Sequence, residues 1–398
     1  MTARGSHRAQ HAPARGGAAG AGAETGAVVV EEPALPPGQG PGERQSSGPD
    51  PGPDLVAGFG AEEAEEAAGL VREGPPPGVG RLLWHQTRVL GQPLAVLVHP
   101  GRGTVTTVVE LTPASGELLA GVQRYGPLTA PADGGAPPAP VLRQLLGRLS
   151  GAGSPFVRLQ VLASSYPPDR TGRVHLVAAL PMSPAVVSAA RAAGERRTRD
   201  RNGTGLALLA GRATLDLARH LAECGLSLSG FLDTAALTEL IRSRYDPGPG
   251  GGRPAAASPW PTEVDATHHR SLRTTTGSTG PTDCYHATAW VKSWPTTADG
   301  LDLTAPLRLP RLSLPRTAAL VLNLGSGQAS TAAGYLSVSA RTPAELDQLR
   351  VDLRRMLPAD SPLQLEWTDR EHHLAFAHTL PLATGLAKAP SADPAAHF

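Results

Sequence analysis

Two glycine-rich segments are candidates for chemistry, because the backbone amides of a glycine loop that opens a helix can hold phosphate groups. The segments are Gly151-Ala-Gly153 and Gly325-Ser-Gly327, and neither is followed by the Gly-Lys-Ser/Thr sequence of a nucleotide-hydrolysing loop. The only lysines, Lys292 and Lys388, lie outside both segments. No Gly-x-Ser-x-Gly sequence occurs either, so the strained turn of an α/β-hydrolase is missing. The sequence therefore predicts neither a P-loop nor a serine-hydrolase site.

Histidines occur in two adjacent pairs, a pattern that raises the question of a metal site. The pairs are His268-His269 and His372-His373, and His378 follows the second pair. Adjacent residues on a regular element point apart, and the chain offers no second cluster with the spacing of metal ligands. We therefore expect no metal site and no cofactor, with structural roles for these histidines.

An arginine-rich run lies between two predicted helices. It contains Arg191, Arg196, Arg197, Arg199 and Arg201, interrupted by Glu195 and Asp200. Clustered arginines raise the local electrostatic potential, which favours contact with anionic lipid headgroups or with an acidic partner. A solvated polar loop is the alternative interpretation, and the sequence leaves it open. The five arginines are the candidate contact site, whereas no residue is assigned a catalytic role.

The first half of the chain contains both predicted strands and predicted helices, and these elements must position the residues above. Apolar and β-branched runs predict strands at 94–98, 104–111, 156–163 and 173–180. The first two are joined as a hairpin by Pro100-Gly-Arg-Gly103. Helices are predicted over 141–149, 185–193 and 206–221, the last ending at Gly225. A short strand at 226–231 follows, and Asp233 is expected to cap another helix.

The second half repeats this pattern of strands and covering helices. Strands are predicted at 284–294, 318–324, 334–340 and 363–367. A helix begins at Thr342-Pro-Ala-Glu345, a capping-box sequence, and runs to about Met356. In the first of these strands Trp290 and Trp294 are four residues apart, so we expect them on one face, with Trp294 closing the core. The fold class is α+β, with two mixed sheet-plus-helix halves.

Glycine and proline mark the boundaries of these halves. Residues 1–80 contain 17 Gly and 11 Pro, with Phe59 as the only aromatic residue. Such a segment cannot bury enough apolar surface to offset the entropy of ordering, so a disordered acidic tail is expected. The predicted organisation is a tail at 1–80, a first α+β half at 81–246, a Gly/Pro linker at 247–258, a second half at 259–385 and a disordered tail at 386–398.

Charge and composition exclude several classes of protein. The chain of 398 residues has a net charge of +1, but residues 1–80 carry −6 and the remainder +7. An aromatic content of 4 % argues against a base-stacking platform, so no nucleic-acid partner is expected. No run of about 18 apolar residues occurs, so no transmembrane helix is expected. Two cysteines, Cys224 and Cys284, provide neither a disulfide framework nor a zinc site, which favours a reduced, cytoplasmic location.

Three stretches, taken in order, resemble the EccE family of type VII (ESX) secretion systems. The first runs from Ser183-Pro-Ala-Val-Val187 through the arginine-rich run to Tyr245. The second joins His268-His-Arg-Ser-Leu272 to a tryptophan-rich strand that ends in Trp294-Pro295. The third runs from Gly334 through the Pro-Ala-Glu-Leu helix start to Pro381-Leu382, so that the resemblance covers about residues 90–385.

This resemblance implies a noncatalytic subunit of, or accessory to, a type VII secretion system, acting by protein–protein contacts at the cytoplasmic face of the membrane. The implied partners are the other secretion subunits, namely the membrane components and an FtsK-like ATPase, with peripheral contact to anionic membrane. Family members usually begin with two transmembrane helices, and here the acidic tail stands in their place. Two alternatives remain open: an accessory protein of a related conjugation or DNA-transfer module, and an enzyme of unrecognised type.

Overall fold

A computed structural model of the chain describes residues 79–120, 139–150, 154–166, 172–195, 204–247, 260–277, 282–297, 300–301, 304–308, 314–324, 332–357 and 359–384. The predicted tail at 1–80 lies outside these residues except for Val79, which is buried, and Gly80. The linker beyond Pro247 and the tail at 386–398 also lie outside them. Within the described ranges no helix is long and apolar enough to cross a membrane.

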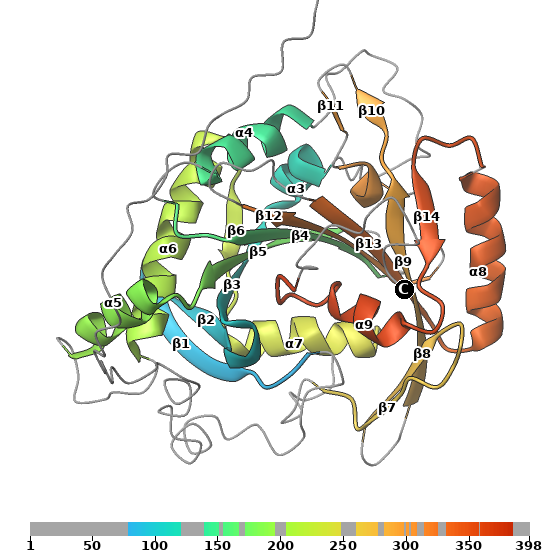
Figure 1. The fold of residues 1–398 in the computed structure, drawn as a ribbon, viewed down its shortest axis with the longest axis horizontal. Coiled ribbons are helices and arrows are strands. Elements are labelled where there is room, and N and C mark those ends of the chain that lie inside the picture. The colour runs from blue at the N-terminus through green and yellow to red at the C-terminus, as the bar shows by residue number, and fades with distance from the viewer. Residues whose placement is uncertain are drawn as a thin grey trace, which may run out of the picture. The chain divides into compact units, whose positions relative to one another are not determined.

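One twelve-stranded antiparallel sheet runs through both halves of the described chain (Figure 1). The strands of the first half are β1 (Leu83–Val89), β2 (Gln92–His99), β3 (Thr104–Leu111), β4 (Arg158–Ser165), β5 (Arg173–Pro181) and β6 (Leu228–Phe231). Those of the second half are β7 (Glu263–Asp265), β8 (Leu272–Thr276), β9 (Thr282–Ser293), β12 (Arg316–Asn323), β13 (Ala332–Ala340) and β14 (Gln364–Trp367). The order is β1-β2-β3-β5-β4-β12-β13-β9-β8-β7, with β6 beside β3 and β14 beside β9. A separate ribbon pairs β10 (Thr296–Thr297) with β11 (Gly300–Leu301).

The two halves of this sheet are structural repeats of each other. Each contributes strands in the order 1-2-3-5-4, counted from the edge to the centre, and each adds a short sixth strand to its third. The strand registers also correspond. Arg158, the first residue of β4, lies opposite Ala179 of β5 and Asn323 of β12. Arg316, the first residue of β12, lies opposite Val338 of β13 and Ser165 of β4. The antiparallel pair β4–β12 therefore stands at an approximate two-fold axis, and it is the junction of the halves.

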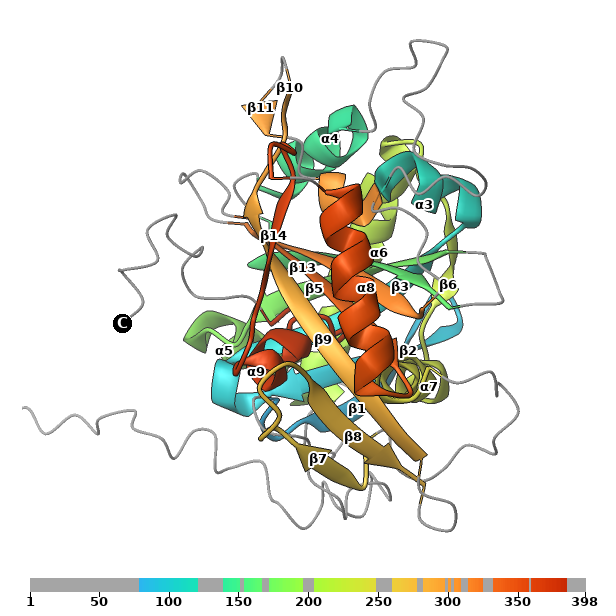
Figure 2. The ribbon, with the colours of Figure 1, turned by 90° about the vertical axis from the view of Figure 1, so that its right-hand side faces the viewer.

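The helices cover the two faces of the sheet unequally. One face packs against α3 (Pro113–Ala120), α4 (Ala139–Leu149), α5 (Pro184–Glu195), α6 (Thr204–Glu223) and α8 (Pro343–Met356). The opposite face packs against α7 (Thr234–Tyr245) and α9 (His372–Ala377). Figure 1 shows α7 and α9 on the other side of the sheet from α3 and α4, and Figure 2 shows α8 crossing β9. Every central strand is thus buried on both faces, which explains its nearly continuous apolar sequence.

Local signals in the sequence account for several boundaries of these elements. The Asp233 carboxylate accepts a hydrogen bond from the Ala236 amide at 2.8 Å and so caps α7. Thr342 and Glu345 form the expected capping box at the start of α8. Gly225, with a φ of 75°, follows the end of α6 in the left-handed conformation that favours glycine. The predicted α+β class is confirmed. The elements that the sequence pattern did not predict are β1, β7, β8, β10, β11, α3 and α9.

Trp290 and Trp294 lie on opposite faces of the sheet, so the expectation that they share a face was wrong. Trp290 packs on the face of α7 and α9, whereas Trp294 packs with Val291 on the face of α8. The pairing of β9 with β14 skips Lys292, and a bulge of this kind shifts the alternation of side chains by one residue. β9 also ends at Ser293, before Trp294.

Gly334 in β13 is required by the packing of Trp294. A Cβ atom at Gly334 would lie 2.6 Å from Val291 Cγ2 and 2.8 Å from Trp294 Cη2. Gly334→Ala should therefore lower the free energy of unfolding by about 1–3 kcal/mol through overpacking. Gly147→Ala in α4 is the matched control, because its Cβ would meet nothing within 4 Å and alanine favours a helix by about 0.5–1 kcal/mol. Urea unfolding measures both, and equal effects of the two substitutions would contradict this packing.

Candidate functional site

The arginine-rich contact site is described at one position only. Arg191 lies in α5 and is exposed to solvent. The described residues do not include the other four arginines, Arg196, Arg197, Arg199 and Arg201. They do not include the glycine segments 151–153 and 325–327 either. The candidate site therefore remains a prediction from the sequence.

The histidines considered as metal ligands take part in separate local contacts. His268 Nε2 lies 3.4 Å from the Asp265 carboxylate, and the His378 ring stacks on Tyr335 with 4.7 Å between ring centroids. His372 is buried, and its Nδ1 accepts a hydrogen bond from the Thr288 amide at 3.1 Å. In the described part of the chain, no group of three or more His, Cys, Asp or Glu residues could hold a metal ion.

A buried arginine with a carboxylate partner lies beside His372. The Arg350 side chain in α8 is 3 % exposed, and its Nη1 donates to Asp369 Oδ1 at 2.9 Å. Its guanidinium lies 4.5 Å from the centre of the Trp367 ring, and Asp369 also lies 3.2 Å from His372 Nε2. Arg350 thereby connects α8 to β14 and to the start of α9. Every charge in this cluster has an opposite partner, as expected for a structural ion pair.

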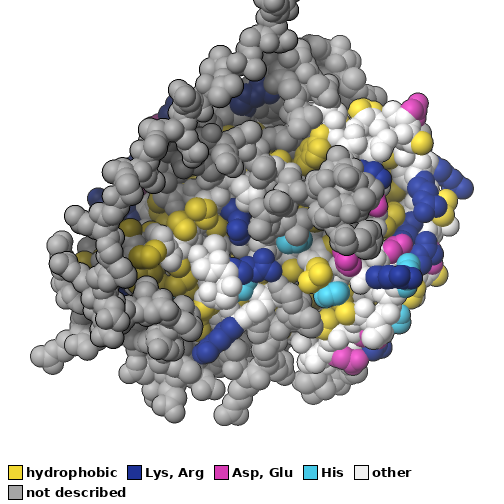
Figure 3. Space-filling model, viewed as in Figure 1, with side chains coloured by type: hydrophobic (Ala, Val, Ile, Leu, Met, Phe, Trp, Pro, Cys, Tyr) yellow, Lys and Arg dark blue, Asp and Glu magenta, His cyan; other side chains and the backbone are white. Residues whose placement is uncertain are grey.

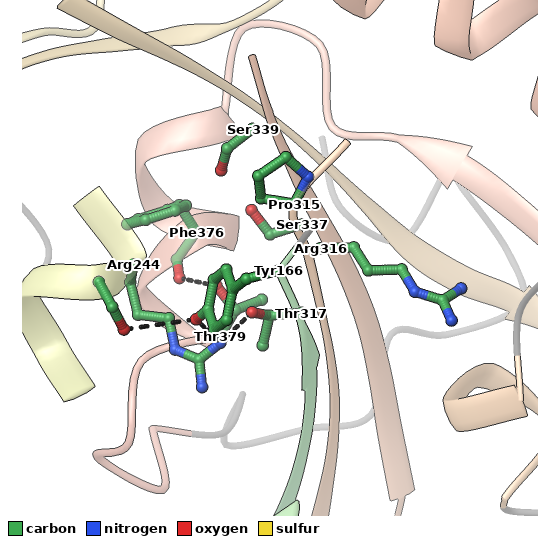
Figure 4. Close-up of a pocket in the computed structure, with 10 residues that line it drawn as sticks. Tyr166, Arg244, Pro315, Arg316, Thr317, Ser337, Ser339, Phe376 and Thr379 are labelled. Carbon is green, nitrogen blue, oxygen red and sulfur yellow. Dashed lines mark hydrogen bonds between the residues drawn. The ribbon is translucent and has the colours of Figure 1, made fainter. Parts of the chain in front are cut away.

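A second buried arginine, Arg244, has no carboxylate partner among the described residues. It is the penultimate residue of α7 and is 3 % exposed. Its Nη1 donates to Tyr166 Oη at 2.7 Å and to Thr317 Oγ1, whereas Nε and Nη2 have no hydrogen-bond partner. In Figure 4, Arg244, Tyr166 and Thr317 point toward one another, and Arg316 points away from them. Burial lowers the pKa of Arg244, because desolvation penalises the charged form.

Arg244 lines a small pocket beside the β4–β12 junction. The pocket has an empty volume of about 210 Å³ that includes its open side. Its lining residues come from both halves of the sheet: Tyr166, Ser243 and Arg244 from the first, and Pro315, Arg316, Thr317, Ser337, Ser339, Phe376 and Thr379 from the second. No lining residue is acidic, and six carry a hydroxyl group. We call this site the Arg244 pocket.

A row of buried hydroxyl groups crosses the sheet beneath α7 and α9. Ser164, Thr317, Ser337 and Thr288 occupy directly paired positions on β4, β12, β13 and β9. All four residues are at most 4 % exposed. Ser164 Oγ, Ser337 Oγ and Thr288 Oγ1 have no hydrogen-bond partner, although buried hydroxyls in proteins normally have one. Two members of this hydroxyl row, Thr317 and Ser337, also line the Arg244 pocket.

Buried histidines on this face of the sheet stay neutral. Burial, followed by the charges of Arg244 and Arg173, lowers the pKa of His175 to about 3. Burial also lowers the pKa of His286 to about 3, and each ring nitrogen of His286 has a hydroxyl partner at 2.8 Å, Ser339 on Nδ1 and Thr274 on Nε2. The nearest charged group to raise the pKa of His286 is Asp246, which follows α7 and pairs with Arg341 at 2.7 Å.

The sequence analysis missed the Arg244 pocket, although one signal for Arg244 was present. Leu237, Ile241 and Arg244 are spaced by four and three residues, which places the arginine on the buried face of its helix. An arginine in such an apolar stripe indicates either an ion pair or a binding site. The hydroxyl row had no comparable signal, because its four members come together only through pairing between distant strands.

Acid should destabilise the fold through its neutral buried histidines. The unfolded chain protonates histidine near pH 6.5, whereas His175 and His286 resist protonation until about pH 3 in the folded chain. The unfolded state therefore binds more protons in this window, and the free energy of unfolding falls as pH falls below about 6.5. His286→Asn should reduce the slope of this free energy against pH by up to about 1.4 kcal/mol per unit.

Ser339→Ala is the matched control, because it removes the partner of His286 Nδ1 and keeps the imidazole. It should lower the free energy of unfolding while leaving the pH slope unchanged. Urea denaturation of the three proteins between pH 7 and pH 5 measures both quantities. A slope that is the same in His286→Asn and in the parent protein would contradict a neutral buried His286.

Comparison with known proteins gives no further assignment. The sequence matches no model of a protein family, and no curated protein matches it.

Proposed function

We propose that the chain acts by binding, as a noncatalytic component of, or accessory to, a type VII secretion system at the cytoplasmic face of the membrane. The observation that carries the proposal is the occurrence of three EccE-like stretches in order along the chain. The described parts of these stretches lie in α5 to α7, in β8 and β9, and from β13 to α9. The proposed partners are the membrane components of the secretion system and its FtsK-like ATPase.

The contacts of the reactive side chains favour binding over catalysis. The lone pair of His372 Nδ1 is used by a backbone amide, so this atom is not free to act as a general base. Cys224 and Cys284 are buried, and burial raises the pKa of the Cys284 thiol to about 12, which removes the thiolate needed of a nucleophile. These groups support the fold, and none is poised for proton transfer or attack on a substrate.

The distribution of surface charge supports the arginine run as the contact site. In Figure 3, basic and acidic side chains are interspersed along the side of the molecule that carries α8. Ion pairs account for part of this mixture, such as Arg270 with Asp347 at 2.9 Å. Evenly mixed charges attract an anionic surface weakly, whereas a cluster with an excess of basic residues contributes on the order of 1 kcal/mol per basic residue near such a surface. The exposed Arg191 marks one end of that run.

Membrane fractionation and affinity capture of a tagged full-length chain test this proposal. The protein is expected in the membrane fraction at low salt, released by high salt, and recovered together with the other secretion subunits. Replacing Arg191, Arg196, Arg197, Arg199 and Arg201 by Gln should reduce the membrane-bound fraction at least tenfold, since each arginine contributes on the order of 1 kcal/mol.

Five exposed arginines elsewhere provide a control of equal charge: Arg88, Arg173, Arg212, Arg219 and Arg355. Replacing these by Gln should leave the membrane-bound fraction largely unchanged. A protein that stays in the soluble fraction at low salt, without any secretion subunit, would contradict the proposed function. Nucleotide turnover by the purified chain would contradict the noncatalytic role.

A further inference from the structure

The tip of the β1–β2 hairpin carries a leucine that is exposed and held in an unfavourable backbone conformation. Leu90 is 75 % exposed, whereas the other exposed large apolar side chains of the described ranges are at most 47 % exposed. Val89 pairs with Gln92, so Leu90 and Gly91 form a two-residue turn, with φ angles of 52° and 82°. Such a turn favours Asn-Gly, because a positive φ is uncommon for bulky residues. The stability of the fold therefore does not explain a leucine at this position.

We infer that Leu90 is a hydrophobic anchor that enters the headgroup region of an anionic membrane. The inference rests on the proposed function, which brings the chain to the membrane surface through its arginine run. Binding to a membrane surface strengthens with the apolar area that is buried as well as with the attraction to anionic lipids. A leucine at the end of a two-stranded hairpin can be buried in lipid without a shaped receptor pocket. Leu90 supplies the apolar part of the contact, and the arginines supply the electrostatic part.

The hairpin tip lies around the same half of α6 as the described part of the arginine run. A Cβ atom at Gly211 of α6 would lie 3.5 Å from the Cγ2 atom of Val89, the residue before the tip. Gly205 of the same helix lies directly against the Ala190 carbonyl group of α5, and Arg191 is the next residue. The two glycines are separated by about 9 Å along the helix. The apolar tip and the exposed arginine are therefore placed to approach one membrane together.

The described side chains around the tip suit an anionic surface. β1, the turn and β2 contain no Asp or Glu. Arg88 points to the other face of the hairpin from α6, because its neighbours Thr87 and Val89 both face Gly211. Among the described side chains of α5, one exposed residue is basic and none is acidic: Pro184, Ala185, Ser188, Ala189, Arg191 and Ala192. A helix face with so little charge can approach lipid headgroups with little loss of hydration.

Binding of the purified full-length chain to vesicles tests the anchor. The vesicles consist of phosphatidylcholine alone or of phosphatidylcholine with anionic phosphatidylserine. Leu90→Asn should lower the partition coefficient on the anionic vesicles about tenfold, because the buried apolar area is lost. The same substitution should raise the urea midpoint of unfolding, since asparagine adopts a positive φ more readily than leucine. Weaker binding by a more stable protein distinguishes an anchor from a residue that supports the fold.

Met356→Gln is the matched control for the loss of an exposed apolar side chain. Met356 is 40 % exposed and ends α8, and Figure 1 shows α8 on the opposite side of the molecule from α5. Its substitution should leave the binding to anionic vesicles unchanged. Equal binding by the parent protein and Leu90→Asn, or an equal loss in Met356→Gln, would overturn the inference.

Affinity capture of the same variants separates this inference from the proposed function. A parent protein that is recovered with secretion subunits but binds no anionic vesicles would overturn the anchor and leave the proposed function in place. If Leu90→Asn lowers the recovery of a secretion subunit and keeps full vesicle binding, Leu90 contacts a protein and the membrane anchor is overturned. Weaker vesicle binding by Leu90→Asn, without any secretion subunit in the captured material, would support the anchor and contradict the proposed function.

Discussion

The antiparallel pairing of β4 with β12 is the interaction on which the rest of the structure depends. It joins two copies of the same strand arrangement into one sheet, and eight directly paired positions form the junction. Without this pairing each half would expose a strand that is apolar on both faces, which is a template for aggregation. The helices on both faces then bury a core that extends across the junction. The Arg244 pocket depends on the same pairing, because residues of both halves line it.

Two buried arginines, Arg350 and Arg244, differ in the groups that offset the cost of burying their charge. Arg350 has a carboxylate, an aromatic face and a backbone carbonyl as partners, so it serves as a connector between α8 and the C-terminal elements. Among the described residues, Arg244 has two hydroxyl partners and no carboxylate partner. Within that part of the chain, the Tyr166 and Thr317 hydroxyl groups and the face of the Tyr166 ring are what compensates the charge of Arg244.

Much of the fold could be predicted from the sequence, because its strongest signals are local. The hairpin at Pro100-Gly-Arg-Gly103, the cap at Asp233 and the capping box at Thr342 all follow from residues within one turn of each other. β8 was missed because the polar run Leu272–Thr276 resembles a loop, although its threonines are buried. The prediction that Trp290 and Trp294 share one face was wrong, because the bulge in β9 arises from its pairing with β14, which the sequence of β9 alone does not show.

The Arg244 pocket could not be predicted, since its residues come from segments up to about 200 positions apart. Local patterning placed Arg244 on a buried helix face, but nothing local indicated whether a carboxylate would meet it there. That information lies in the register of β4, β12 and β13, which only the folded structure fixes. The five predicted contact arginines are the opposite case: they are contiguous and easily read from the sequence, and only Arg191 lies in the described structure.

Native-state hydrogen exchange of the amides in β4 and β12 tests most directly whether the halves form one cooperative unit around the pocket. The structure predicts that both strands exchange only through global unfolding, with the same opening free energy as that obtained from urea denaturation. Opening of β12 and β13 at a free energy about 2 kcal/mol or more below that of β4 would show that the halves unfold separately, and would contradict this account.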